Sequence, residues 1–126
     1  MNDESYLMFT EHGARLEGGI RTAVEAWCAD RDAAKAQYGP IASWNTSEIT
    51  NMKYLFDRKA GFNEDISRWD VSNVTKMRYM FSCATSFNHQ LGGSWSQSMA
   101  NMDHMFGNGC PGSIVGKTNN AAGTPV

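Results

Sequence analysis

The sequence contains little of what marks a metal site, a disulfide framework or a membrane protein. It has only three cysteines, Cys28, Cys83 and Cys110, no Cys-x-x-Cys pair, and only three prolines in 126 residues. An odd, sparse set of cysteines does not form a disulfide framework, and zinc sites are usually built from closely spaced cysteine pairs. No run approaches the roughly 20 apolar residues that cross a bilayer, so we expect no transmembrane segment.

The chain also lacks a strong excess of charge of either sign. Its 11 Lys and Arg residues stand against 13 Asp and Glu residues, a formal net charge of −2. Such a balance creates no field that attracts nucleic acid or an anionic membrane, so we expect no nucleic acid partner. Residues 1–15 are polar and mixed in charge and lack the basic start and apolar run of a secretory signal. These features leave the localisation unknown.

What the sequence does contain is a repeat with a period of 25 residues, clearest when residues 44–62 are set beside residues 69–87. Apolar positions stay apolar at this period, and Phe62 and Phe87 are each followed by Asn. A fixed period of this length is typical of solenoids. Five apolar columns are three members deep: Ile41/Ile66/Leu91, Ile49/Val74/Met99, Met52/Met77/Met102, Leu55/Met80/Met105 and Phe56/Phe81/Phe106.

The third copy of the repeat is less regular than the first two. Trp95 lies one place later than Trp44 and Trp69 require, and the register recovers by Met99. After Phe106 the pattern fails, since Gly112 stands at the Phe62/Phe87 position and Gly116 at the Ile66/Leu91 position. Residues 107–126 are rich in Gly and Asn and are expected to form an irregular tail.

Within one repeat two kinds of segment alternate. Residues 66–69 favour a short strand, and residues 74–81 place Val74, Met77, Met80 and Phe81 on one face of a two-turn helix. Such a unit buries its apolar face only by stacking on its copies, with the strands about 4.8 Å apart in a parallel sheet. This pattern predicts an α/β repeat, a solenoid of about three repeats over residues 41–106.

The segment before the repeats has helical periodicity. Ile20, Val24 and Trp27 fall on one face, and an Ala-rich charged stretch follows, stopped by Gly39-Pro40. We therefore expect residues 18–40 to form a helical cap that covers the first repeat with Val24 and Trp27, after a polar N-terminal segment, residues 1–17.

Residues 62–81 (FNEDISRWDVSNVTKMRYMF) closely resemble the repeat of BspA-like leucine-rich-repeat surface proteins. The resemblance extends over about residues 20–106 and includes the helical lead-in. It implies a short right-handed solenoid of the leucine-rich-repeat type, in a family generally uncharacterised or described as adhesins and binding surfaces. It also suggests a location at the cell surface or outside the cell. No catalytic residues carry over from the family.

Three patterns that could carry chemistry are each better explained otherwise. Cys83 and His89 could form a nucleophile–base pair, but Cys83 matches Arg58 in the previous repeat, which favours an ordinary loop thiol. Residues 112–118 lack the spacing and the flanking strand and helix of a phosphate-binding loop. The acidic residues do not recur in the third repeat, so they favour a solvated edge over a calcium site; they are Asp57, Glu64, Asp65 and Asp70. We expect no enzyme activity, metal or cofactor.

Two of the three cysteines could form a disulfide. Cys83 corresponds to Asn108 in the next repeat, two residues from Cys110, and equivalent positions of stacked repeats lie about 5 Å apart. A turn at residues 107–109 could bring Cys110 within bridging distance of Cys83. Such a bridge would imply an oxidising compartment.

The repeat therefore favours a non-catalytic protein–protein interaction or structural module, a subunit or segment of a larger assembly. Two exposed columns form a candidate interaction surface, although they could also be ordinary solvated positions. The alternative is a cell-surface adhesive module that binds carbohydrate or calcium. We name the two columns together the surface stripe: Lys53, Tyr54, Arg78, Tyr79, Asp103 and His104.

Overall fold

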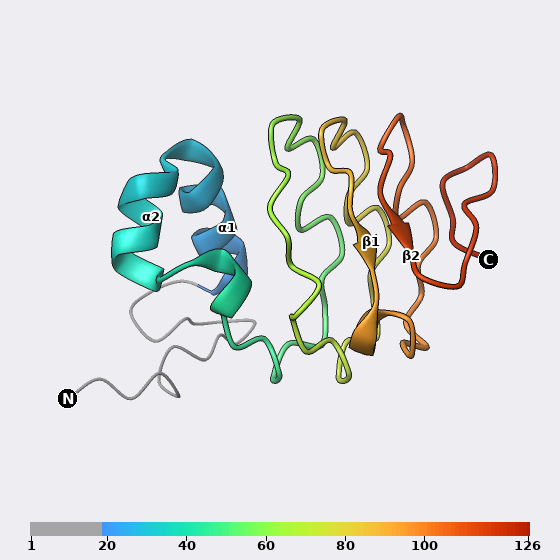
Figure 1. The fold of residues 1–126 in the computed structure, drawn as a ribbon, viewed down its shortest axis with the longest axis horizontal. Coiled ribbons are helices and arrows are strands. Elements are labelled where there is room, and N and C mark those ends of the chain that lie inside the picture. The colour runs from blue at the N-terminus through green and yellow to red at the C-terminus, as the bar shows by residue number, and fades with distance from the viewer. Residues whose placement is uncertain (1–18) are drawn as a thin grey trace.

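The computed structural model describes residues 19–126, so the predicted polar segment 1–17 lies outside the described residues. It is a small mixed α/β structure with two helices, α1 (Ile20–Ala29) and α2 (Arg31–Tyr38). Two short strands, β1 (Gln90–Leu91) and β2 (Ser113–Ile114), form a parallel sheet. The helices lie at one end, and the chain then passes back and forth towards the C-terminus at the other end (Figure 1). No helix within residues 19–126 has the length and apolar character needed to cross a membrane.

Both predicted helices of the lead-in are present. On α1 the side chains of Ile20, Val24 and Trp27 are buried, as the periodicity predicts. The Asp30 carboxylate accepts a hydrogen bond from the Ala33 N–H at 3.2 Å and so caps α2, because the first amides of a helix have no partner within it. Gly39 ends α2 with a positive φ of 82° and a ψ of 176°, a conformation that glycine adopts without strain.

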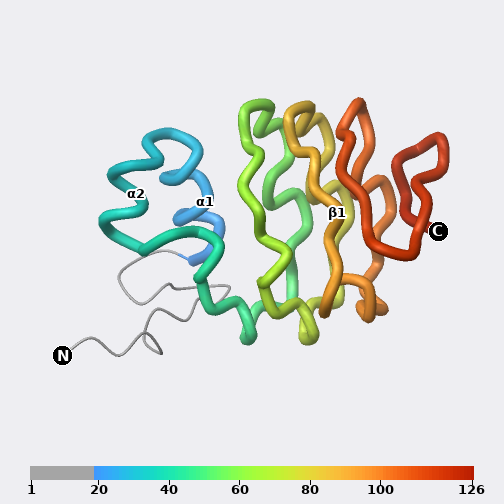
Figure 2. Tube along the Cα trace, in the orientation of Figure 1, coloured from blue at the N-terminus to red at the C-terminus, as the bar shows by residue number. Residues whose placement is uncertain are grey.

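Equivalent segments of successive repeats lie side by side (Figure 2) and are hydrogen-bonded in parallel. Asn51 is bridged to Lys76, and Lys76 to Asn101, which is the offset of 25 residues found in the sequence. Alternate amides make the bonds: the Phe56 N–H donates to the Met80 carbonyl at 2.8 Å, and the Phe81 N–H to the Met105 carbonyl at 2.8 Å. Equivalent residues of successive repeats, which are chemically similar, therefore lie next to each other.

The core consists largely of aromatic rings stacked at this offset. The ring of Phe81 lies 5.3 Å from Phe56 and 5.5 Å from Phe106, with interplanar angles of 3° and 2°. Phe62 and Phe87 stack in the same way at 5.9 Å. Rings in contact through their faces exclude water and add an aromatic contribution to burial.

Two tryptophans each link a repeat to the one before it. The Trp69 indole N–H donates to the Ile41 carbonyl at 2.8 Å, and the Trp95 indole N–H to the Ile66 carbonyl at 3.1 Å. Trp95 therefore takes the expected role although it lies one place late. A short 3₁₀ helix, Gly93–Trp95, absorbs the extra residue, with Gly93 at φ 60°.

The predicted helix over residues 74–81 is wrong, and the structure has consecutive turns there instead. Tyr79 and Cys83 have positive φ angles of 57° and 62°, and the equivalent residues of the other repeats do too. In the first repeat the Lys59 N–H bonds to the Phe56 carbonyl at 3.1 Å with Arg58 at φ 64° between them, as a type II turn requires. A left-handed residue every few positions interrupts a helix, and the freed amides bond to the next repeat.

Arg58→Asn is expected to stabilise the protein by about 1 kcal/mol. Asparagine tolerates the left-handed region that costs other residues roughly this amount, and Asn108 already occupies the equivalent position in the third repeat. The exposed ion pair that Arg58 forms with Asp57 at 3.6 Å contributes little. Chemical denaturation would measure the change. Arg68→Asn is the control, because Arg68 is exposed but has no positive φ, and an equal gain there would contradict this explanation.

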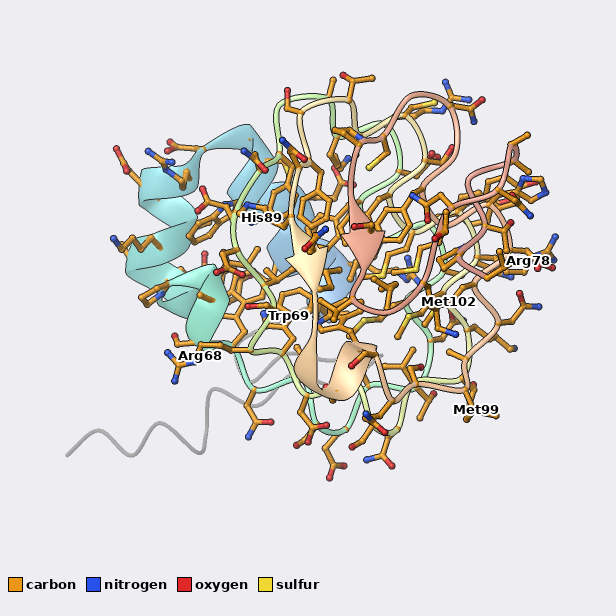
Figure 3. All side chains as sticks on the ribbon, turned by 45° about the vertical axis from the view of Figure 1, so that its right-hand side comes forward. Arg68, Trp69, Arg78, His89, Met99 and Met102 are labelled. Carbon is orange, nitrogen blue, oxygen red and sulfur yellow. The ribbon has the colours of Figure 1, made fainter. Side chains whose placement is uncertain are left out.

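The assignment of Met99 to the Ile49/Val74 column is also wrong. Ile49 and Val74 are buried, but Met99 is 97% exposed and projects from the surface (Figure 3). The late position of Trp95 leaves one residue fewer between the tryptophan and the next bridged position, Asn101. The shorter connection cannot place Met99 inward.

The C-terminal residues are not irregular as the sequence suggests. β2 pairs with β1 at an offset of 23, so Leu91 faces Ile114 and not Gly116. Gly112 is buried against the Phe87 ring, and a Cβ at this position would come within 2.7 Å of that ring, so only glycine fits. This connection is two residues shorter than in the earlier repeats. The shortening places the apolar side chain of Ile114, and not Gly116, beside Leu91.

Residues 118–126 fold back on themselves and cover the third repeat. The Thr118 N–H and the Val126 N–H each donate to the other residue's carbonyl, at 3.1 and 2.9 Å. From this hairpin the Gly123 carbonyl accepts a hydrogen bond from the Phe106 N–H at 2.9 Å. At the equivalent residues Phe56 and Phe81, the amide instead donates to a carbonyl of the next repeat. The hairpin therefore supplies the acceptor that a further repeat would supply, and it covers the edge of the last repeat.

Candidate functional site

The structure brings the three ring-bearing residues of the surface stripe together. Tyr79 stacks on Tyr54 at 5.1 Å with an interplanar angle of 3°, and on His104 at 4.8 Å with an angle of 10°. All three residues have positive φ angles, which turn their side chains outward from consecutive turns. Tyr54 is 47% exposed, and it is one of the few large apolar side chains at the surface of the described residues.

Backbone hydrogen bonds fix the spacing of this stack. The Tyr54 N–H donates to the Arg78 carbonyl and the Tyr79 N–H to the Asp103 carbonyl, each at 3.0–3.1 Å. The His104 N–H instead donates to the Thr124 hydroxyl of the C-terminal hairpin at 2.8 Å. The stripe is therefore a rigid surface, and binding to it would order few side chains.

One charged member of the stripe, Arg78, lies beside the rings. The guanidinium of Arg78 lies over the Tyr79 ring, 5.8 Å from its centroid, a cation–π arrangement. Lys53 and Asp103 occupy the equivalent positions in the neighbouring repeats, where each amide is fixed by the preceding Asn side chain. Four of the six predicted residues thus lie in contact, on consecutive turns where a helix was expected: Tyr54, Arg78, Tyr79 and His104.

Sequence reasoning missed Lys76, which belongs to the same surface. Its backbone is bridged to Asn51 and Asn101, its side chain is exposed, and it precedes Arg78 by two residues in extended backbone. Residues two apart in extended chain point to the same side. The missed signal was this period of two, because the segment was interpreted with helical spacing.

A cleft of about 690 Å³ separates the helices from the first repeat. Trp27 and Phe62 contribute to its walls, and two ion pairs cross it. Lys59 Nζ lies 2.6 Å from Glu25 Oε2, and Arg31 lies 3.2 Å from Glu64. Because the helix member of each pair is largely exposed, Glu25 at 67% and Arg31 at 64%, water screens the pairs and they contribute little to stability. They do connect α1 and α2 to the first repeat. No pattern in the sequence indicated this cleft.

The structure has its three cysteines as free thiols, and Cys83 and Cys110 are not bridged. The Cys83 hydrogen-bond partner is Ser82, whereas the Cys110 thiol donates to the Phe87 carbonyl at 3.7 Å. Cys110 thus lies beside Phe87 and not beside Cys83, because two residues are missing from the third repeat. Burial raises the pKa values of Cys28 and Cys110, which makes both thiols less reactive at neutral pH.

The other candidate chemistry is not assembled in the described part of the chain. His89 packs on Phe87 and lies 3.2 Å from the Asn63 carbonyl, and it forms no hydrogen bond with Cys83. Residues 113–114 form β2 and a turn follows, without the helix that a phosphate-binding loop needs. Within residues 19–126 no three His, Cys, Asp or Glu side chains gather where they could hold a metal ion.

Comparison with known protein families shows to which family the chain belongs. Residues 29–111 match the family described as "Mycoplasma protein of unknown function, DUF285". The chain belongs to the DUF285 family. The match includes α2, all three repeats and the first residues after them, so the DUF285 sequence pattern coincides with the stacked part of the structure. No curated protein and no solved structure matches the chain.

Proposed function

We propose that this DUF285 protein is a short solenoid of 25-residue repeats, of the kind found in BspA-like proteins, that acts as a non-catalytic protein–protein interaction module. The single observation that carries the proposal is the surface stripe, in which Tyr54, Tyr79 and His104 stack at the surface on hydrogen-bonded turns. Parallel pairing at a constant offset and stacked rings support the solenoid. Exposed tyrosines on a rigid surface are favoured contact residues.

The stacking favours a protein partner over a sugar. Sugar rings pack on an open aromatic face, but both faces of the central ring, Tyr79, are covered, by Tyr54 and by His104. Only the outer faces of the two end rings lack a ring against them. The ring edges and the tyrosine hydroxyls remain available, and these suit the hydrogen bonds and edge contacts of a protein interface. We further propose that the module works as a subunit or segment of a larger assembly at the cell surface.

Tyr54→Ala is expected to abolish capture of the partner from cells of the source organism when the full chain is the bait. Tyr54 is the more exposed end of the stack, so its loss removes contact area but leaves the core intact. Binding of the purified partner, measured by calorimetry, should weaken about tenfold or more, as at an interface hot spot.

Val115→Ala is the matched control, because Val115 is 48% exposed but follows β2, on a different segment of the repeat. Thermal unfolding of both variants would check that they fold. Equal capture by Tyr54→Ala and the unmodified chain would contradict the interaction role of the stripe.

A further inference from the structure

The face that carries the surface stripe is basic, although the whole chain has a net charge of −2. Lys53, Lys76 and Arg78 project from two adjacent repeats, and Asp103 in the third repeat is the one acidic member of the stripe. Equivalent positions of adjacent repeats lie about 5 Å apart, so Lys53 and Arg78 are direct neighbours. Three cations are thus concentrated beside the stacked tyrosine rings, of which Tyr54 is exposed and Tyr79 half-buried.

These cations have no anionic partner in the described chain. The ion pairs among residues 19–126 involve Arg31, Arg58 and Lys59. Lys53, Lys76 and Arg78 take part in none of them, and the Arg78 guanidinium lies over the Tyr79 ring. Unpaired cations held at fixed spacing attract anions and gain energy when a partner carboxylate excludes water from them.

We propose that this face binds an acidic, extended segment of a partner protein, an inference that rests on the proposed interaction function. Carboxylates of the segment pair with Lys53, Lys76 and Arg78, and the tyrosine hydroxyls donate hydrogen bonds beside them. Asp103 repels acidic residues at the third repeat, so the acidic part of the segment lies over the first two repeats. The balance of charge over the whole chain disfavours nucleic acid, which needs a larger basic surface.

The test is binding of a short, fluorescently labelled polyglutamate peptide to the full chain, followed by fluorescence anisotropy. Saturable binding at low ionic strength, lost as salt is raised, is the expected result. Arg78→Glu and Lys53→Glu should each weaken binding about tenfold or more, while Arg78→Lys retains most of it. Labelled polylysine should not bind.

Arg68→Glu is the matched control, because it makes the same change of net charge at an exposed arginine. Arg68 and Arg78 lie on opposite sides of the molecule (Figure 3). Equal weakening by Arg68→Glu and Arg78→Glu would overturn the proposal, since net charge alone would then explain binding. Equal or tighter binding of a single-stranded DNA or of phosphatidylserine vesicles would overturn the assignment to a protein segment.

Failure of this inference can be distinguished from failure of the proposed function. If Tyr54→Ala abolishes capture of the native partner but Arg78→Glu does not, the stripe binds a protein and the acidic segment is wrong. If polyglutamate binds through Arg78 while no native partner depends on Tyr54, the proposed interaction function fails and the basic face remains.

Discussion

Phe81→Ala is expected to lower the free energy of unfolding by about 3–5 kcal/mol, a large share of the roughly 5–15 kcal/mol typical of a small domain. Phe81 is fully buried in the middle repeat, where its ring contacts Phe56, Phe87 and Phe106. Removing the ring leaves a cavity with aromatic side chains around it, and the hydrogen-bonded repeats cannot close on it. Urea denaturation followed by circular dichroism would measure the loss.

Tyr54→Ala is the control for Phe81→Ala, since it removes an aromatic ring from the same kind of stack at the surface. Its cost should be about 1 kcal/mol, the value of one exposed ring contact. A cost for Phe81→Ala as small as that of Tyr54→Ala would show that the ring stack is not the core of the protein. Both variants can be measured in the same denaturant series.

From the sequence one expects a smaller loss at Phe106, because a terminal repeat should be buried on one side only. The structure changes this expectation. Phe106 is only 2% exposed, since Gly112 packs against its ring and the Gly123 carbonyl accepts a hydrogen bond from its amide. The loss at Phe106 should therefore approach that at Phe81.

The repeat made much of this fold predictable from the sequence. The offset of 25 residues places Phe56, Phe81 and Phe106 in one column, and the structure stacks them at that offset. Such a column is informative because only stacking of the repeats brings residues so distant in sequence into contact. The same offset identified the stripe, since Tyr54, Tyr79 and His104 are equivalent positions.

The local backbone was less predictable, for a physical reason. Apolar residues at Val74, Met77, Met80 and Phe81 match a helix, but they match consecutive turns equally well if Tyr79 is left-handed. Tyrosine rarely adopts that conformation, so nothing in its identity signals the turn. Ring stacking and hydrogen bonds between repeats offset the backbone strain. These are tertiary interactions, so a local sequence pattern does not reveal their contribution.

Small changes of chain length had the largest consequences that the sequence did not reveal. The connection after Trp95 is one residue shorter than in the earlier repeats, and Met99 is exposed as a result. The connection before β2 is two residues shorter, so that Ile114 and not Gly116 is the neighbour of Leu91. A strict period cannot anticipate where a shortened loop restores the register. The basic face was missed for a related reason, because Lys76 falls on the stripe only if the backbone is extended there.

The C-terminal hairpin leads to the second large prediction. Gly123→Ala should cost about 3 kcal/mol and detach the hairpin from the third repeat. Gly123 has φ 82°, and a Cβ there would lie 2.5 Å from the Gly107 Cα and 2.5 Å from the Phe106 carbonyl carbon. Both contacts are with backbone, which cannot move aside without breaking the hydrogen bond from Phe106 to Gly123.

Gly116→Ala is the control that separates the steric clash of a Cβ from the strain of a positive φ angle. Gly116 has φ 87° but nothing within 4 Å of its Cβ position. That variant should lose only about 1 kcal/mol, the cost of alanine in a left-handed conformation. In Gly123→Ala, and not in the control, the Phe106 amide should lose hydrogen-exchange protection. The uncovered edge should also make the protein associate as its concentration rises, since unpaired backbone groups pair with other chains. Equal stability and equal protection in the two variants would show that the hairpin does not hold the end of the stack closed.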